Sequence, residues 1–190
     1  MIHGDDFVST ASPGELQWFK KELEKRFKIK TQVIGPGASY AKEGRALNRI
    51  LRYTASGWEY EPDQRHAELI VKELGLDTAN GLSTPGDKLR DGEIDETELD
   101  PQKATRYRQI GARANYLALD RPDIMFAVKE VCRSMSKPTV SSWNKLKKLG
   151  RYLRGRPRII YKYDWTEMNY ELTAHTDSDY AGCVLSLILI

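Results

Sequence analysis

The chain has 190 residues, 40% of them hydrophobic and 30% charged, and a formal net charge of +3 at pH 7. This composition is typical of a folded protein with one large or two small cores, and it excludes a disordered polymer. No stretch reaches the roughly 18 apolar residues of a membrane span. The start has no signal-peptide pattern, and the two cysteines have no disulfide or metal-ligand spacing. We therefore expect an intracellular protein, cytoplasmic or nuclear.

The first ten residues, MIHGDDFVST, place two adjacent carboxylates between short apolar pieces. The polar stretch HGDD is typical of a turn, so a β-hairpin is predicted here, with Asp5 and Asp6 at its tip. Adjacent like charges repel unless solvent or a cation screens them. Two interpretations are open at this point: an ordinary solvated turn, or a Mg²⁺ site completed by other oxygen ligands.

A helix is predicted directly after the hairpin. Ser12 suits the N-cap, Pro13 the first helical position and Glu15 the third, which together form a capping box. The residues expected on its apolar face are Leu16, Phe19, Leu23 and Phe27. Residues 46–53 and 57–61 are then predicted to form a hairpin across the sequence TASG.

A second helix is expected over about residues 63–74, ended by Gly75. Its predicted buried stripe consists of Leu69, Ile70 and Leu74. Three further helices are predicted, over residues 100–116, within 121–138, and from 139 to 155. The last 30 residues return to strand, where RIIYKYDW and YELTAHTDSDY are expected to pair across the turn TEMN.

A second pair of carboxylates occurs near the end of the chain. Asp177 and Asp179 are two residues apart, so in a strand they point to one face and could share a cation, with His175 beside them. The alternative, a polar strand end in solvent, stays open for this pair alone.

The densest basic cluster lies near the end of the fifth predicted helix. On a helix, Lys147, Arg151 and Arg154 share a face beside Tyr152, which forms a candidate track for template phosphates. A solvated helix face explains the same pattern equally well. The candidate nucleic-acid-binding residues are Lys147, Lys148, Arg151, Arg154 and Arg156.

Taken in order, these segments resemble the stretch from polymerase to ribonuclease H in the Pol polyprotein of copia-type LTR retrotransposons. IHGDDFV stands where that family has its aromatic-x-Asp-Asp palm hairpin, and GLSTPGD resembles its Val-Ser-Thr-Pro connector. YRQIGARANYL, RPDI and MSKP resemble its next conserved block, and KKLGRYLRGRP its Arg-Tyr-Leu-Lys-Gly element. HTDSDYAGC resembles the strand that opens the ribonuclease H domain.

The resemblance implies an α+β fold in four parts. Residues 1–76 are expected to form a partial palm and thumb, and residues 77–99 an exposed acidic connector. Residues 100–158 are expected to form a helical connection region, and residues 159–190 the truncated start of a ribonuclease H-like domain, with its first hairpin.

The resemblance also assigns roles to the carboxylates. Asp5 and Asp6 match the metal-binding pair of an RNA-directed DNA polymerase, in which two Mg²⁺ ions promote phosphoryl transfer. Asp177 matches the first carboxylate of the ribonuclease H site, and Asp179 receives no catalytic role. The implied partners are an RNA template, a DNA primer and an RNA/DNA hybrid. His3 departs from the family pattern, which has an aromatic residue there.

The sequence holds no match to the family's fingers, to the third palm carboxylate or to most of the ribonuclease H site. A site short of ligands binds Mg²⁺ weakly, so we expect the isolated chain to be inactive, with missing parts supplied by other Pol segments or by self-association. Two alternatives are a non-catalytic nucleic-acid-binding module that uses residues 139–163, and a domesticated structural or interaction domain.

Overall fold

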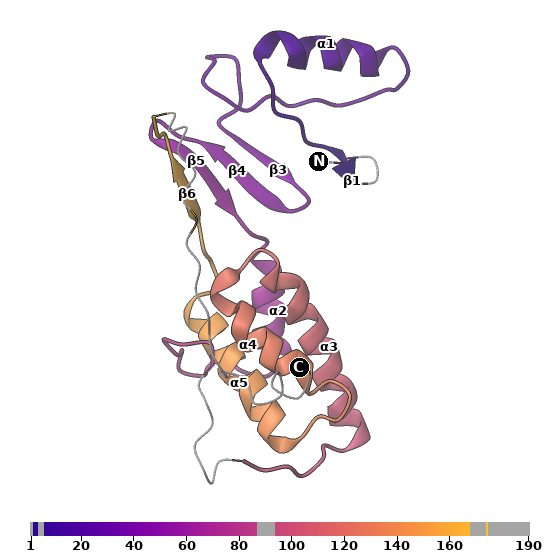
Figure 1. Ribbon diagram of the computed structural model, residues 1–190, viewed down its shortest axis with the longest axis vertical. Coiled ribbons are helices and arrows are strands. Elements are labelled where there is room, and N and C mark those ends of the chain that lie inside the picture. The colour runs from indigo at the N-terminus through magenta and orange to yellow at the C-terminus, as the bar shows by residue number, and fades with distance from the viewer. Residues whose placement is uncertain (1, 4–5, 87–93, 168–173, 175–190) are drawn as a thin grey trace.

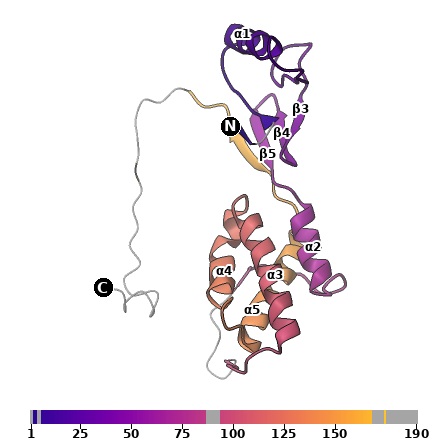
Figure 2. The same cartoon turned by 90° about the vertical axis from the view of Figure 1, so that its right-hand side faces the viewer.

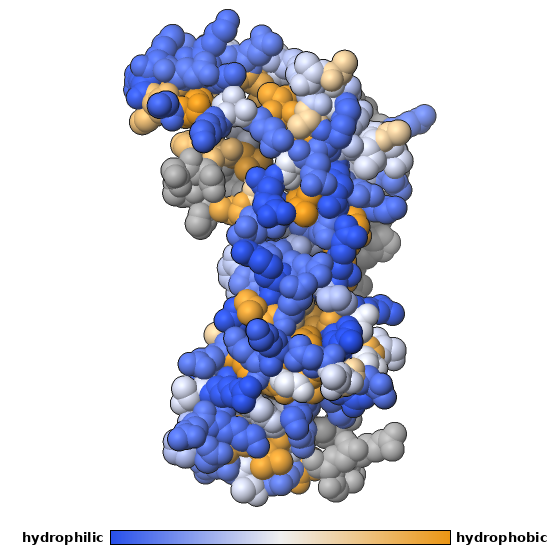
Figure 3. All heavy atoms as spheres, turned by 180° about the vertical axis from the view of Figure 1, so that it is seen from behind, coloured by the Kyte–Doolittle hydropathy of each residue, from blue (hydrophilic) through white to orange (hydrophobic). Residues whose placement is uncertain are grey.

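The computed structural model describes residues 2–3, 6–86, 94–167 and 174. The molecule is elongated, with a small antiparallel sheet and helix α1 towards one end and a group of four helices at the other (Figure 1). Seen from behind, it narrows between these parts, and hydrophilic residues cover most of its surface (Figure 3). The combination of helices with an antiparallel sheet agrees with the predicted α+β class. The palm, thumb and ribonuclease H assignments stay predictions.

The predicted N-terminal hairpin is present. Strand β1 (Ile2–His3) pairs antiparallel with β2 (Asp6–Phe7), with Ile2 opposite Phe7 and His3 opposite Asp6. Asp6 thus belongs to the second strand, and Asp5 lies outside the described residues.

Helix α1 (Pro13–Glu24) begins where the sequence predicted. The Ser12 side chain accepts a hydrogen bond from the Glu15 backbone N–H, and the Glu15 carboxylate accepts one from the Ser12 backbone N–H, so the capping box is formed. Its expected apolar face is not buried in a core: Leu16, Phe19 and Leu23 are half-buried, and Phe27 is 61% exposed. The helix lies apart from the bundle in both views (Figures 1 and 2).

Four strands form one antiparallel sheet in the order β3-β4-β5-β6. They are β3 (Glu43–Ala46), β4 (Arg49–Tyr53), β5 (Gly57–Glu61) and β6 (Tyr161–Asp164). The hairpin predicted across TASG joins β4 to β5. The single strand predicted over residues 46–53 is wrong, because Leu47 and Asn48 have φ values of 49° and 63° and make a two-residue turn between β3 and β4.

Strand β6 comes from far along the chain to pair with β5, with Tyr60 opposite Tyr161 and Trp58 opposite Tyr163. Gly57 makes this approach possible, since a Cβ at this position would lie 2.0 Å from the Tyr163 carbonyl oxygen. The strand predicted to pair with residues 158–165 across TEMN lies outside the described residues, apart from residue 174.

Helix α2 (Arg65–Glu73) buries Ala67, Ile70 and Val71. Leu69, predicted to be buried, is 38% exposed, because the buried stripe runs through the other face of the helix. Gly75 follows the helix with φ +67°, the left-handed conformation that favours glycine at a helix end.

The main core lies among α2 and three longer helices, α3 (Pro101–Ala118), α4 (Pro122–Arg133) and α5 (Val140–Gly155). The Asp100 side chain caps α3, and a capping box of Thr139 and Ser142 starts α5. Fully buried members of this core include Ile70, Tyr107, Ile110, Ala114, Ile124, Leu146, Leu149 and Leu153. In the described part of the chain, no helix is long and apolar enough to cross a membrane.

Candidate nucleic-acid interface

The predicted catalytic hairpin is described only in part. The backbone of Asp6 is fixed by its pairing with His3, and the hairpin leads within a few residues into the capped start of α1. Asp5 and Asp177 lie outside the described residues, so the structure does not test whether these carboxylates converge.

Mg²⁺ requires nearly complete octahedral coordination by oxygen ligands. Within residues 6–86 and 94–167, no group of three or more histidine, cysteine, aspartate or glutamate side chains is placed to hold a metal ion. The described residues therefore do not form a two-metal site, and the magnesium assignment stays a prediction based on the resemblance.

The five predicted nucleic-acid-binding residues differ in their surroundings. The Arg151 Nε donates to the Asn80 carbonyl at 2.9 Å, and the Arg154 Nε donates to the Asp77 carbonyl at 2.8 Å. These arginines hold the segment after α2 against the end of α5. The Leu82 backbone adds a hydrogen bond to the Arg151 carbonyl at 3.2 Å, so part of the predicted connector is docked on the bundle.

The other three residues predicted to bind nucleic acid also differ from one another in their surroundings. The Arg156 guanidinium lies 5.8 Å from the ring centre of Tyr152, which is itself buried. Lys147 is exposed and Lys148 is half-buried, and among the described residues neither forms an ion pair. The two lysines are therefore the best-placed members of the track for phosphate contacts.

The RPDI motif forms the most buried ionic centre of the described chain. Arg121 is 1% exposed, and its guanidinium donates two hydrogen bonds to the Asp123 carboxylate, at 2.9 and 2.8 Å. It also donates to the carbonyls of Arg156 at 3.1 Å and Pro157 at 3.3 Å. The motif thus fixes the chain that leaves α5.

Asp123 completes this centre from the other side. Tyr152 donates its hydroxyl to the Asp123 carboxylate at 2.8 Å. Burial opposes ionisation of Asp123, but the hydrogen bonds from Arg121 and Tyr152 outweigh it, and the pKa of this carboxyl lies below its usual value. The same burial, with the bond to Asp123, raises the pKa of Tyr152.

The YRQIG motif also has a structural role, because its residues pack α3 against the end of α4. Tyr107 is fully buried and donates its hydroxyl to the Val131 carbonyl at 2.7 Å. Arg108 donates to the Met135 carbonyl at 2.7 Å, so it secures the end of α4. Gly111 brings α3 close to the Met135 side chain, whose terminal methyl would lie 2.8 Å from a Cβ at this position.

A second ionic centre joins the sheet to the helices. Asp120, in the loop between α3 and α4, accepts hydrogen bonds from Arg49 Nε at 2.9 Å and from the Tyr60 hydroxyl at 2.6 Å. Burial and the bond to Asp120 raise the pKa of Tyr60. The sequence analysis did not identify this centre, because its members come from three distant segments.

A third centre surrounds Glu61, which is 5% exposed at the end of β5. Arg158 and Arg52 both donate to its carboxylate, Arg52 at 2.6 Å. These hydrogen bonds, the one from Arg158 above all, outweigh burial and lower the pKa of Glu61 to about 2. Arg158 follows the predicted basic track in the sequence. Its guanidinium binds Glu61 at the end of β5 and so stabilises the sheet.

The chain is similar in sequence to a mitochondrial protein and to two transposon polyproteins. No protein-family model matches the chain, and no solved structure matches it. The chain is 32% identical over 121 residues to an uncharacterised mitochondrial protein of Arabidopsis thaliana. The match covers 63% of this chain and 48% of that protein. It is 41% and 40% identical over 80 residues to the retrovirus-related Pol polyproteins from the Arabidopsis transposons RE2 and RE1.

The matches to the two polyproteins cover 41% of this chain and 5% of each polyprotein. The chain therefore spans about half the length of the mitochondrial protein and a small part of the Pol polyproteins. These matches confirm the resemblance to transposon Pol polyproteins that the motifs indicated.

Proposed function

Since this chain is a homologue of the retrovirus-related Pol polyproteins of transposons, we propose that it is a segment of a reverse transcriptase that binds nucleic acid and does not copy it alone. By this proposal, it runs from the end of the polymerase palm, through a helical connection, to the start of ribonuclease H. Its partners are an RNA template, a DNA primer and their hybrid.

The observation that carries the proposal is the N-terminal hairpin. Asp6 sits in a strand paired with His3, and the chain passes directly into a box-capped helix. This is the local arrangement that the resemblance implies for a palm hairpin. In the proposal, Asp5 and Asp6 are its metal-binding carboxylates, and Asp177 is the first carboxylate of the ribonuclease H site.

Inactivity of the isolated chain is proposed from coordination chemistry. Mg²⁺ at such a site draws on several carboxylates at once, and the resemblance matches two residues of this chain, Asp5 and Asp6, to the palm site. Other Pol segments, or a second copy of the chain, are proposed to complete the site. A bound Mg²⁺ ion then supplies the charge neutralisation that phosphoryl transfer needs.

Nucleic-acid binding is assigned to the exposed side of α5. Lys147 and Lys148 are next to each other there, and no acidic side chain among the described residues pairs with either. Arg151 and Arg154 support them by fixing residues 77–80. Phosphate contacts of this kind do not depend on base sequence and weaken as salt rises.

The test is the affinity for a fluorescent RNA/DNA hybrid, measured by anisotropy at 50 and 200 mM salt. We expect binding at low salt that weakens at high salt. Lys147→Ala/Lys148→Ala should bind several-fold more weakly, with a salt slope lower by about 1 to 2. The matched control, Lys72→Ala/Lys129→Ala, removes two exposed lysines from α2 and α4. Equal effects of the two double variants, or no binding by the unchanged chain at 50 mM salt, contradict the assignment.

A further inference from the structure

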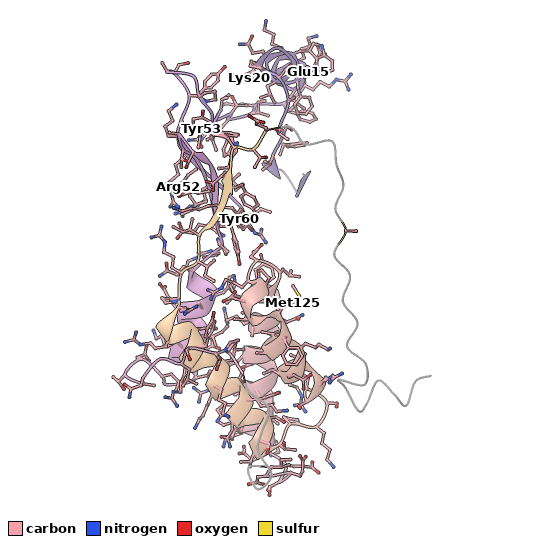
Figure 4. The ribbon with its side chains drawn as sticks, turned by 60° about the vertical axis from the view of Figure 1, so that its left-hand side comes forward. Glu15, Lys20, Arg52, Tyr53, Tyr60 and Met125 are labelled. Atoms are coloured by element: carbon pink, nitrogen blue, oxygen red, sulfur yellow. The ribbon has the colours of Figure 1, made fainter. Side chains whose placement is uncertain are left out.

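The four-stranded sheet has two chemically different faces. Side chains alternate along each strand, and directly paired residues share a face. The charged face carries Glu43, Arg52, Glu59 and Lys162, one from each strand. The other face carries Tyr53 and Leu51 of β4, Trp58 and Tyr60 of β5, and Tyr161 and Tyr163 of β6. Arg52 and Tyr60 project from opposite sides of the sheet (Figure 4).

Ion pairs cross the charged face. Arg52 pairs with Glu43 at 2.5 Å and lies 4.0 Å from Glu59, and Lys162 lies 3.8 Å from Glu59. Because the polar residues of the sheet collect on this side, the aromatic face is the one expected to be covered. Within the described ranges, however, no helix packs extensively against the sheet.

Four rings lie together at one end of the aromatic face. We call this cluster the aromatic end, and its members are Tyr53, Trp58, Tyr163 and Trp165. The Tyr53 ring centre lies 5.6 Å from that of Trp58 in an edge-to-face arrangement, and 5.7 Å from that of Trp165. Tyr163 is directly opposite Trp58 on the neighbouring strand. The cluster thus takes rings from β4, from β5 and from β6 with the residue that follows it.

The outer rings of the aromatic end are exposed, and hydrogen bonds hold that of Trp165 in place. Tyr163 is 60% exposed and Trp165 is 53% exposed. The Trp165 indole donates to the Ala55 carbonyl at 3.2 Å, and its backbone nitrogen donates to the Ser56 carbonyl at 2.8 Å. Stabilising the sheet does not require half of each ring to face water, whereas a preorganised ring loses little entropy when a ligand stacks on it.

A positive charge lies beside these rings. The Lys42 ammonium is 5.2 Å from the ring centre of Tyr53, and the carbonyls of Gly35 and Pro36 hold it there at 2.8 and 3.1 Å. A ligand with planar rings and negative charges suits this combination, since the rings stack and the ammonium attracts the charge.

We propose that the aromatic end binds unpaired bases of single-stranded nucleic acid by stacking on Tyr163 and Trp165. In a duplex the faces of the bases are already stacked on their neighbours, so exposed aromatic rings select single strands. The inference rests on the nucleic-acid-binding function proposed above, and it adds a second contact, on the sheet, to the phosphate contacts of α5.

The test measures binding of the full chain to a fluorescent 12-nucleotide oligo(U) and to an RNA duplex of equal length. Tyr163→Leu and Trp165→Leu remove the rings and keep apolar side chains. Tyr163→Phe and Trp165→Phe keep a ring at each site. We expect each Leu variant to bind oligo(U) at least about fivefold more weakly. The Phe variants should stay within about twofold of the unchanged chain, and duplex affinity should change little.

The matched control is Phe126→Leu, which removes an aromatic ring that is 69% exposed on α4. It should leave oligo(U) binding unchanged. Circular dichroism and the urea midpoint check that each variant is folded. If a Leu variant loses the sheet, two other measurements replace it. The Phe variants are compared with the unchanged chain, and oligo(U) is added to Trp18→Phe/Trp143→Phe, whose remaining tryptophans, Trp58 and Trp165, both lie in the aromatic end. Quenching of their fluorescence supports the proposal, and unchanged fluorescence contradicts it.

Three results count against the inference, and they are distinguishable. If folded Leu variants bind oligo(U) as well as the unchanged chain while Lys147→Ala/Lys148→Ala binds weakly, only the aromatic end is wrong. If the unchanged chain binds neither probe at low salt, the nucleic-acid function fails as a whole. Weaker binding by Phe126→Leu than by Tyr163→Leu also counts against the aromatic end.

Discussion

Tyr60 donates its hydroxyl to the Asp120 carboxylate at 2.6 Å, and this pair links the sheet to the helical bundle. The same carboxylate forms an ion pair with Arg49, whose Nη2 lies 2.8 Å from the Asp120 Oδ2. Among the described residues no helix packs extensively against the sheet, so this pair is one of the side-chain links that hold the two parts together.

Replacing Tyr60 by Phe should weaken the junction. The change removes one hydrogen bond to a charged acceptor, which contributes about 1.5 to 3 kcal/mol. Asp120 keeps its pairing with Arg49, so we expect a loss near the lower end of this range. Urea unfolding followed by tryptophan fluorescence measures it. An unchanged urea midpoint contradicts a stabilising role for the pair, and Tyr163→Phe serves as a control on the open part of the same face.

Arg121→Met should be among the most destabilising single changes in the chain. Arg121 is 1% exposed, and its removal deletes its hydrogen bonds to the partly buried Asp123 carboxylate and to two carbonyls, so that Asp123 keeps the Tyr152 hydroxyl but loses its charged partner. Breaking such a buried pair costs about 3 to 5 kcal/mol. The double variant Arg121→Met/Asp123→Leu should recover part of this loss. Thermal unfolding measures both, and a loss below about 1 kcal/mol for the single variant contradicts the assignment.

Stability should fall in acid through Glu61. Its pKa in the folded protein is about 2, below the ordinary value of 4.5, so the unfolded state takes up the proton first. The contribution is therefore fully present above about pH 4.5 and is lost as the pH falls towards 2. We expect it to be about 2 kcal/mol, because Arg158 is half exposed and solvent screens part of the interaction.

The measurement for Glu61 is the free energy of unfolding between pH 6 and pH 2, for the unchanged chain and for Glu61→Gln. The variant should be less stable at pH 6, and the difference should shrink in acid. A constant difference across this range shows that the carboxylate charge does not carry the effect.

Gly57→Ala should detach strand β6. The added Cβ would meet the Tyr163 carbonyl oxygen at 2.0 Å, a distance that no small adjustment relieves. Amide hydrogen exchange at the hydrogen-bonded positions of β6 should then accelerate, while the helical core keeps its protection. Gly14→Ala is the control, since a Cβ there meets nothing within 4 Å. Unchanged exchange in β6 means that the strand does not depend on Gly57.

The parts of the fold that sequence reasoning identified are those set by local chemistry. The capping box of Ser12 and Glu15 follows from side chains within three residues of the backbone groups they bind. The turn at Leu47 and Asn48 was missed, because Leu rarely takes a positive φ and an apolar run suggests a continuous strand.

The features that sequence reasoning missed depend on contacts between distant segments. Tyr60 and Asp120 are 60 residues apart, and Arg158 reaches Glu61 across 97 residues. No periodicity within one segment reveals such a partner. The alternation of aromatic residues in β5 and β6 was visible in the sequence, but only the pairing of these strands places the rings on one face.

The most direct test of the central claim is a single experiment on a labelled DNA primer annealed to an RNA template with Mg²⁺. It measures binding and primer extension together, for the chain and for Asp5→Asn/Asp6→Asn. The account predicts that both proteins bind the primer–template at low salt and that neither extends it. Extension by the unchanged chain that is lost in the Asn variant would contradict the account, because it would show that this chain forms a complete polymerase site.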